Sequence, residues 1–449
     1  MIMFDTSGRG LRKSKMDWVL LGAVAAILAA GTLAIMSATV ALPAYGHIIR
    51  THFLALPLAA LFFLFGWSLN YQLYQDQWKI LYGVILLALA AVLFLGVTDR
   101  GSKSWFHLPF FSVQPSELCR VALILVFANF LDRNSSRVHE PAMLLKGMAL
   151  AAPFFYLLMK QPDFSGVALT FPVIIGMLYC SGARLFHLLV LLGFGFIAGL
   201  LPVLWTMLSL HPDWLEASDI LQAFYSLRAF GLPALGFCAA VAALAWFFYW
   251  LSKQFRAYLP PVYFLGGALV VILGFATAVW AQGQMKEYQR KRFEVFLMPA
   301  ADPKGAGYNL LQAQIGMGSG GFLGKGVFSG TQARLGFVPE RHTDFVLAVV
   351  GEEMGFLGTA GVLLLYLLML MRILGAADTA QGQYGYLVCC GVFTMFLVYM
   401  MINFGMLVGL IPVAGIPLPL VSYGGSNVVA SLWALGIVES IYARRMALV

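Results

Sequence analysis

The sequence of 449 residues contains few charges: Asp, Glu, Lys and Arg make up 11% of it, whereas hydrophobic residues make up 61%. Soluble proteins carry about 25% charged residues, so this scarcity excludes an ordinary soluble protein. A membrane-spanning helix needs about 20 apolar residues, and the mean hydropathy of +0.85 is high enough for many of them. The apolar runs are also too continuous for the short alternating strands of an outer-membrane barrel. We therefore predict an all-α, polytopic transmembrane helical bundle.

Cysteines and clustered metal ligands are scarce as well. The five cysteines all fall in predicted spans, where we interpret them as small hydrophobic residues rather than disulfide partners. The seven histidines are scattered, with no spacing typical of a zinc site. A hard cation held by Asp or Glu and by substrate phosphates stays open. No short cleavable signal peptide is visible, because the first apolar run already has the length of a span.

Twelve apolar runs, separated by charges and turn residues, predict twelve membrane spans in a single integral membrane domain over residues 1–449. The predicted spans are 18–42, 52–68, 79–97, 115–131, 145–159, 164–181, 184–209, 229–252, 260–281, 345–372, 384–404 and 425–443. An even number of spans places both termini on the same side of the membrane.

The net charge of +8 comes mostly from Lys and Arg beside apolar runs, so we interpret it as a topology signal rather than a nucleic-acid surface. The short loops on one side hold fourteen basic residues: Arg9, Arg12, Lys13, Lys15, Lys79, Arg133, Arg137, Lys146, Arg184, Lys253, Arg256, Arg372, Arg444 and Arg445. The opposite short loops hold five: Arg50, Arg100, Lys103, Lys160 and Arg228. The first side, with both termini, is therefore predicted to be cytoplasmic. Outside lie loop 98–114, the junction 161–163 and a large extracytoplasmic loop at 282–344, whose apolar content favours a functional role.

Charged residues at membrane depth are costly, so each is a candidate functional residue. Arg120 lies three residues after Glu117 on the same helical face, and the two can simply pair. Glu117 also suits a helix start, with Pro115 in the first position. Asp163 lies between two apolar runs, where capping of the next helix is the favoured interpretation.

Asp344 is the strongest catalytic candidate, because it lies where a polar loop meets a long apolar helix and has Glu340, Arg341 and His342 close by in sequence. Capping by Thr343 or Asp344 is the alternative. The glycines at 316–321 have the spacing of a dinucleotide site but no preceding strand, which argues against one. Lys325, between two glycines, lacks the Ser or Thr of a P-loop, although such a backbone suits an anionic ligand.

Several short motifs follow one another over most of the chain: GSKSW at 101–105, QPSE at 114–117, QPD at 161–163, DP at 302–303 with 305–312, the glycine-rich run 316–330, PERHTDF at 339–345, GEE at 351–353 and GIPLPLVSYGGS at 415–426. In this combination and order the sequence resembles the SEDS family (shape, elongation, division, sporulation), the RodA and FtsW group of peptidoglycan glycosyltransferases. Segments 288–299 and 337–340 and the glycine-rich run are more similar to the elongation members, RodA, than to the division members, FtsW.

The sequence departs from the family pattern in two respects. Arg120 stands where the family usually has Lys, which keeps the charge but replaces an ammonium with a forked guanidinium. The family usually has ten spans, so the predicted twelve include a surplus pair, 229–281, which we interpret as an inserted helix pair. The insertion leaves the two-sided topology unchanged.

The resemblance implies that the chain polymerises lipid II into glycan strands during cell elongation and rod-shape maintenance, on the outer face of the bacterial cytoplasmic membrane. Asp344 is then expected to be the catalytic base. Arg120 is expected to stabilise the pyrophosphate, helped by Lys103, Lys325 or Arg341 and by a divalent cation, Mg²⁺ or Mn²⁺. Glu117 and Asp163 are expected to position Arg120, the substrate or that cation. No nucleotide cofactor is expected.

The resemblance also matches Trp105 to a family position at the external rim, for which an ordinary interfacial aromatic is the favoured interpretation. It further implies a class B penicillin-binding protein, a transpeptidase, as partner.

Three function classes remain in competition: a polymerase, a lipid II flippase or other transporter, and a scaffold without catalysis. A division-type FtsW paralogue is the alternative within the family. A carrier needs charges near the membrane midplane, between repeats, and no internal repeat is evident. Glu117, Asp163 and Asp344 all fall at predicted external helix ends, which favours the polymerase.

Overall fold

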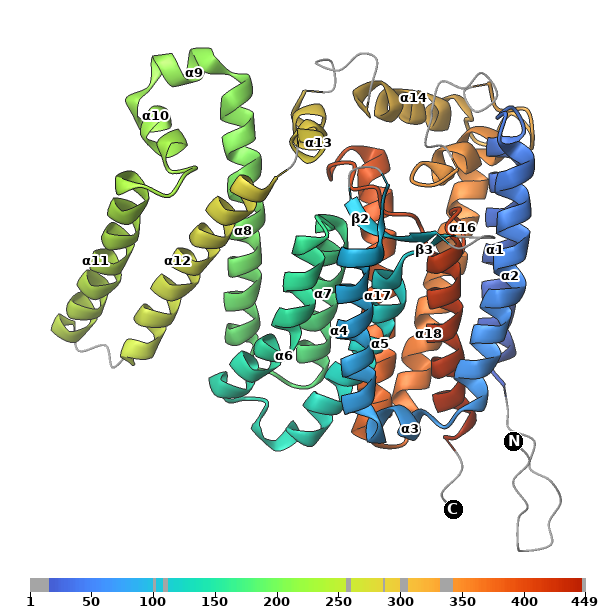
Figure 1. Cartoon of the computed structure of the whole chain (residues 1–449), viewed down its shortest axis with the longest axis horizontal. Coiled ribbons are helices and arrows are strands. Elements are labelled where there is room, and N and C mark those ends of the chain that lie inside the picture. The colour runs from blue at the N-terminus through green and yellow to red at the C-terminus, as the bar shows by residue number, and fades with distance from the viewer. Residues whose placement is uncertain are drawn as a thin grey trace, which may run out of the picture. The chain divides into compact units, whose positions relative to one another are not determined.

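The computed structural model describes residues 16–99, 102–107, 112–255, 260–285, 287–298, 306–331 and 342–445. The chain divides into two compact units, one made of residues 1–182 and 303–449 and the other of residues 183–302. Both are built mainly from helices (Figure 1).

The first unit contains most of the helices and all of the described strands. Its elements are α1 (Trp18–Thr39), α2 (Tyr45–Ser68), α3 (Tyr71–Asp76), α4 (Trp78–Leu95), β1 (Val97–Asp99), β2 (Ser102–His107), β3 (Ser112–Val113), α5 (Pro115–Arg133), the 3-10 turn η1 (Ser135–Arg137), α6 (Pro141–Lys160), α7 (Phe164–Cys180), α14 (Ala306–Ser319), α16 (Val346–Asp378), α17 (Gly382–Val408) and α18 (Gly425–Ala443).

The second unit contains α8 (Leu185–Leu210), α9 (Pro212–Ala217), α10 (Asp219–Ser226), α11 (Leu232–Gln254), α12 (Pro261–Gln284) and α13 (Glu287–Leu297). Its core is formed around Trp205, whose indole N–H donates to the carbonyl of Phe224 over 3.2 Å, and Phe275 of α12 packs beside it. The predicted inserted pair corresponds to α11 and α12, which pack against each other. Its origin as an insertion stays a prediction.

Among the described residues, ten helices are long and apolar enough to cross a membrane: α1, α2, α4, α6, α8, α11, α12, α16, α17 and α18. The two remaining predicted spans are also helical. Of these, α7 is shorter, with 17 residues, and α5 carries Glu117, Arg120, Asp132 and Arg133. The prediction of an all-α, multi-pass membrane bundle is therefore confirmed, whereas the number twelve and the side of the termini stay predictions.

A small antiparallel sheet, β1-β2-β3, lies where we had expected only a loop at 98–114. Trp105 pairs with Val97 and Lys103 with Thr98, and β2 continues to β3 through Phe106 opposite Val113. Only two residues, one of them Gly101, join β1 to β2, which is a length typical of a hairpin. The sequence analysis predicted no strands here, because long apolar helical runs dominate the rest of the chain.

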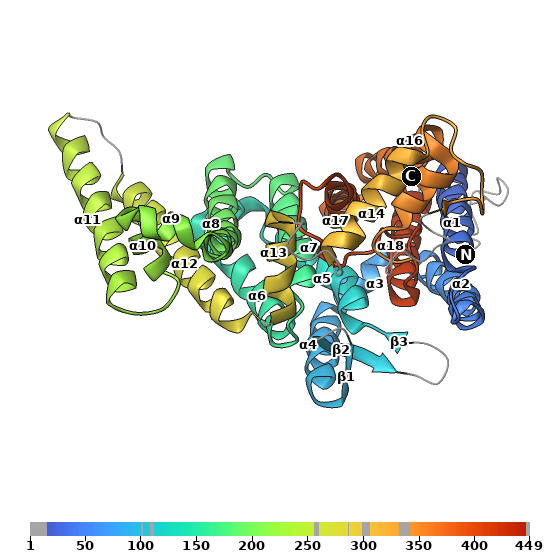
Figure 2. The same cartoon turned by 90° about the horizontal axis from the view of Figure 1, so that it is seen from above.

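The helix α17 lies at the centre of the first unit and packs against α5, α7, α16 and α18, as Figure 2 shows from above. Most of its side chains are buried, including the polar Tyr399 and Asn403. Because a buried polar group without a hydrogen-bond partner destabilises the folded protein, the partners of these two residues are informative about function.

The glycine-rich run pairs with a break in α16. Gly355 has φ 65°, and this break frees carbonyl groups of the preceding turn. The amides of Lys325 and Gly326 donate to the carbonyls of Glu352 and Glu353 over 3.0 and 2.9 Å. At Gly324 a Cβ atom would lie 2.1 Å from the carbonyl oxygen of Glu353, so only glycine fits there. The run therefore has a structural role in holding the broken helix.

Candidate active site

The predicted pair of Glu117 and Arg120 forms in the first two turns of α5. The Nη1 atom of Arg120 lies 3.0 Å from Oε2 of Glu117. The exposed fractions are 2% for Arg120 and 8% for Glu117, so the ion pair is almost completely removed from solvent. Pro115 is in the first turn of α5, as predicted for a helix start.

Two further residues join this pair. The hydroxyl of Tyr399 on α17 donates to Oε2 of Glu117 over 2.6 Å and also accepts from Arg120. Nδ2 of Asn427 on α18 lies 3.0 Å from the same Oε2. Three donors thus converge on one carboxylate oxygen, which fits an ionised Glu117.

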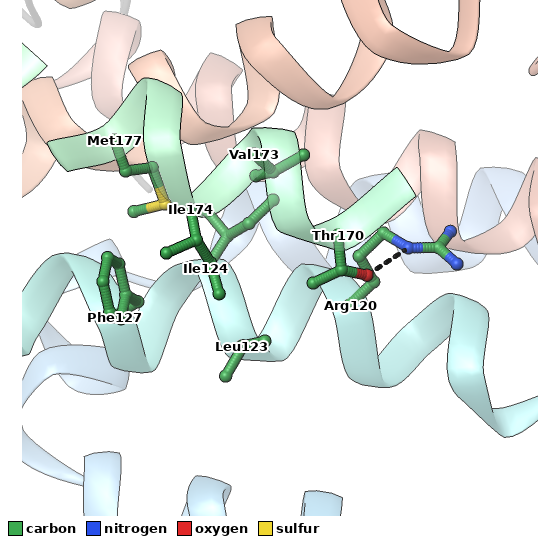
Figure 3. Close-up of a pocket in the computed structure, with 8 residues that line it drawn as sticks. All are labelled: Arg120, Leu123, Ile124, Phe127, Thr170, Val173, Ile174 and Met177. Atoms are coloured by element: carbon green, nitrogen blue, oxygen red, sulfur yellow. Dashed lines mark hydrogen bonds between the residues drawn. The ribbon is translucent and has the colours of Figure 1, made fainter. Parts of the chain in front are cut away.

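Arg120 also connects α5 to α7, because its Nε donates to Oγ1 of Thr170 over 3.2 Å. Figure 3 shows this bond at one end of a narrow space between the two helices, lined otherwise by apolar side chains such as Phe127 and Met177. The guanidinium group points away from that apolar lining, and it bonds Glu117 and Tyr399. The network of Glu117, Arg120, Thr170, Tyr399 and Asn427 is called the α5 network below.

Asp163 caps α7, as its favoured interpretation predicted: its Oδ1 accepts the amide hydrogen of Gly166 over 2.8 Å. Oδ2 accepts from the hydroxyl of Ser116 on α5 over 3.4 Å. Burial raises the pKa of Asp163, and the Gly166 amide and the charge of Arg120 oppose this shift. Asp163 therefore joins the starts of α5 and α7.

Asp344 lies in the turn before α16 and is buried, with 7% of its surface exposed. Phe345 occupies the N-cap position, and Thr343 and Asp344 lie in the turn directly before it, so capping by one of these two side chains stays the alternative to catalysis. The backbone carbonyl of Asp344 accepts a hydrogen bond from Nδ2 of Asn403 over 3.2 Å. The amide of Tyr423 donates to the carbonyl of His342 over 2.9 Å, which fixes the same turn from the other side.

The loop between α17 and α18, residues 409–424, brings four helix starts together. The hydroxyl of Ser165 at the start of α7 donates to Ala414 in this loop over 2.6 Å. Tyr423, at the end of the loop, holds the turn before α16. In the first turn of α18, Oγ of Ser426 accepts the amide hydrogen of Gln114, just before α5, over 2.9 Å. The positive dipole ends of α5, α7, α16 and α18 therefore lie around one loop, next to Glu117, Asp163 and Asp344.

The hairpin residues and the lysine of the glycine-rich run have partners outside the α5 network. Nζ of Lys103 on β2 donates to the carbonyl of Phe94 over 3.1 Å, and Trp105 on the same strand is half-buried. Nζ of Lys325 lies 2.9 Å from Oε1 of Glu352, which is 1% exposed. Arg341, the other predicted helper, lies outside the described residues.

The expected divalent cation has no prearranged donor set here. Among the described residues, no group of three or more His, Cys, Asp and Glu side chains is placed to hold a metal ion. Oε2 of Glu117 already accepts three hydrogen bonds, and both oxygens of Asp163 accept one each. Metal binding by Glu117 and Asp163 therefore stays a prediction, with no third acid, His or Cys grouped with them among the described residues.

Sequence reasoning missed Tyr399, Asn403 and Asn427. Each is a polar residue inside an apolar span, which is the signal that could have identified them. None of them has a charged neighbour in sequence, and their partners lie far away along the chain: Tyr399 is 282 residues from Glu117.

Comparison with known proteins gives consistent matches. The family model FTSW_RODA_SPOVE, described as cell cycle protein, matches residues 17–231 and 232–446. The chain is 32% identical to the peptidoglycan glycosyltransferase MrdB of Escherichia coli over 379 residues, 84% of this chain and 80% of that protein. It is 30% identical to the peptidoglycan glycosyltransferase RodA of Treponema pallidum over 438 residues, 96% of this chain and 99% of that protein.

Solved structures are similar as well. A chain in the work "Structural coordination of polymerization and crosslinking by a peptidoglycan synthase complex" aligns with a TM-score of 0.66 and 26% identity, covering 96% of this chain and 98% of that one. The crystal structure of the rod shape determining protein RodA of Thermus thermophilus aligns with a TM-score of 0.58 and 24% identity over the same shares, which shows a common fold.

Proposed function

The chain belongs to the FtsW, RodA and SpoVE family of cell cycle proteins, and we propose that it joins lipid II units into glycan strands at the outer face of the cytoplasmic membrane. The predicted family is thereby confirmed. The names of the relatives also confirm the prediction of a peptidoglycan glycosyltransferase and agree with a role in elongation. The substrate details, the face of the membrane and the roles of single residues are our proposal.

The proposal rests on one observation above all: a buried acid, Asp344, lies beside the loop around which four helix starts meet. In the reaction, the 4-hydroxyl of the acceptor sugar attacks the anomeric carbon of the donor. A carbon–oxygen bond forms there, and the bond to the lipid pyrophosphate breaks. The hydroxyl proton needs a base, and the leaving group needs positive charge.

Asp344 supplies the base in this scheme, because its carboxylate can accept the hydroxyl proton as the new bond forms. The leaving pyrophosphate is favoured by the positive dipole ends of α5, α7, α16 and α18. The guanidinium of Arg120 contributes one positive charge, which is already paired with the carboxylate of Glu117. A divalent cation that enters with the substrate is compatible with this arrangement, since phosphate oxygens can supply its ligands.

A class B penicillin-binding protein is the partner that we propose. The support is the likeness to a chain of a complex in which polymerisation and crosslinking are coordinated. Such a transpeptidase would crosslink the strands that this chain makes.

The substitution Asp344→Asn tests the proposal, because it removes the carboxylate and keeps the size of the side chain. General-base catalysis predicts a loss of about 100-fold to 10,000-fold in glycan formation from lipid II, with a normal melting temperature. Asp132→Asn is the matched control: Asp132 is a partly exposed acid near the other end of α5, where it accepts a hydrogen bond from Gln75. The control variant is expected to retain activity.

Two results would contradict the proposal. Normal polymerisation by the folded Asp344→Asn protein would remove Asp344 from the chemistry. Wild-type protein that makes no glycan with lipid II, partner and Mg²⁺ or Mn²⁺ present would instead favour the flippase.

A further inference from the structure

Asn403 is an amide buried inside the apolar helix α17, with an exposed fraction of 0%. Its Nδ2 donates to two backbone carbonyls, that of Asp344 over 3.2 Å and that of Ile416 over 2.9 Å. Both acceptors are carbonyl oxygens, so the nitrogen of the amide must face them. The side chain therefore ties the turn that carries Asp344 to the loop 409–424.

These two hydrogen bonds come with a cost. Oδ1 of Asn403 is buried and has no hydrogen-bond partner among the residues that the structure describes. A buried acceptor without a donor destabilises the folded state, and an apolar side chain of similar size would avoid that penalty. The presence of an amide is therefore explained better by what its nitrogen holds in place than by stability.

The position of Asn403 on α17 links it to the α5 network. Tyr399 precedes it by four residues, so the two side chains lie on the same face of the helix. Tyr399 contacts Glu117 and Arg120, and Asn403 contacts the backbone of Asp344. One face of α17 thus reaches both the buried ion pair and the turn with the proposed base.

We propose that Asn403 is a positioning residue: it holds the backbone of Asp344 so that the carboxylate meets the acceptor hydroxyl. This role rests on the proposed function of Asp344. A displacement of a reacting group by about 1 Å can cost on the order of 100-fold in rate. Loss of the amide should therefore act on the chemical step rather than on substrate binding.

The test compares Asn403→Leu, which has no donor, with Asn403→Asp, which keeps the shape and as a neutral acid can donate only one hydrogen bond. We expect kcat for lipid II polymerisation to fall about 10-fold to 100-fold in the Leu variant and less in the Asp variant, with KM within roughly twofold of wild type. Rates are taken per folded protein, determined by size-exclusion chromatography and thermal melting.

Thr394→Val is the matched control, because it removes a side-chain hydrogen bond to the carbonyl of Cys390 within the same helix, α17, and is not part of the α5 network or of the turn of Asp344. It should leave kcat unchanged. If one Asn403 variant does not fold, the other carries the test. The two Asn403 variants support a positioning role only if their kcat falls while their KM and the kcat of the control variant do not change.

Asp344→Asn, measured in parallel, separates two kinds of failure. If it is inactive while both folded Asn403 variants have the wild-type kcat, the positioning role is wrong and the base assignment survives. If it polymerises normally, both are wrong. A fall in melting temperature with an unchanged kcat per folded protein would show that Asn403 only stabilises the fold.

Discussion

The buried pair of Glu117 and Arg120 allows a quantitative prediction. Glu117→Gln replaces the charged partner of Arg120 with a neutral amide, so that among the described residues the guanidinium keeps only neutral hydrogen-bond partners, which include the hydroxyls of Thr170 and Tyr399. Arg120→Met leaves the carboxylate of Glu117 with two donors, Tyr399 and Asn427. Because loss of one partner of a buried pair costs about 3–5 kcal/mol, we expect about 4 kcal/mol for Glu117→Gln and about 3 kcal/mol for Arg120→Met.

The double variant decides whether the pair acts as a unit. Without either charge, no uncompensated ion remains buried, so the joint loss should be about 2 kcal/mol smaller than the sum of the single losses. The free energy of unfolding is measured by chemical denaturation of all four purified proteins in detergent micelles. Losses that add to within about 0.5 kcal/mol would refute a working pair.

Two further predictions concern topology and the lysine of the glycine-rich run. With single cysteines at positions 342 and 254, an impermeant thiol reagent applied to intact cells should label the first and not the second; labelling at 254 would overturn the predicted topology. Lys325→Met should lower the melting temperature, because Lys325 bonds Ser319, Thr331 and Glu352. A structural role also predicts that KM for lipid II stays within roughly twofold of wild type, whereas a large rise in KM would support the predicted contact with pyrophosphate.

Much of the site could be predicted because its signals are local in sequence. Arg120 follows Glu117 by three positions, which puts the two on one helical face, and the structure pairs them. Asp163 follows a turn and precedes an apolar run, and the structure shows it capping α7. In both cases the relevant partner lies within a few positions, so periodicity and capping preferences were sufficient.

The partners supplied by α17 and α18 could not be predicted in this way. Tyr399 and Asn427 bond Glu117 across 282 and 310 residues, and nothing in either neighbourhood indicates which helices pack together. Asn403 shows the same limitation, because its acceptors are backbone carbonyls that any sequence provides. These contacts depend on which helices pack together, and local sequence patterns do not indicate that packing.

The glycine-rich run was interpreted by its composition, and its actual role depends on a distant helix. We considered an anionic ligand because glycines expose backbone N–H groups. Two of those groups instead donate to carbonyls of Glu352 and Glu353, which the break at Gly355 leaves available. The apolar run 345–372 predicts one continuous span, so the sequence alone indicates neither the break at Gly355 nor the loop that bonds to it.

The charges around α5 limit what Arg120 can do for the leaving group. Arg120 is paired with Glu117, and Asp163 lies near enough to act on its charge. A pyrophosphate brought to this guanidinium would also meet the two carboxylates, which repel it. Arg120 therefore serves first to hold Glu117 and, through Thr170, the start of α7. In the proposed reaction we therefore expect the greater part of the positive potential for the leaving group to come from the four helix starts and from a cation that accompanies the substrate.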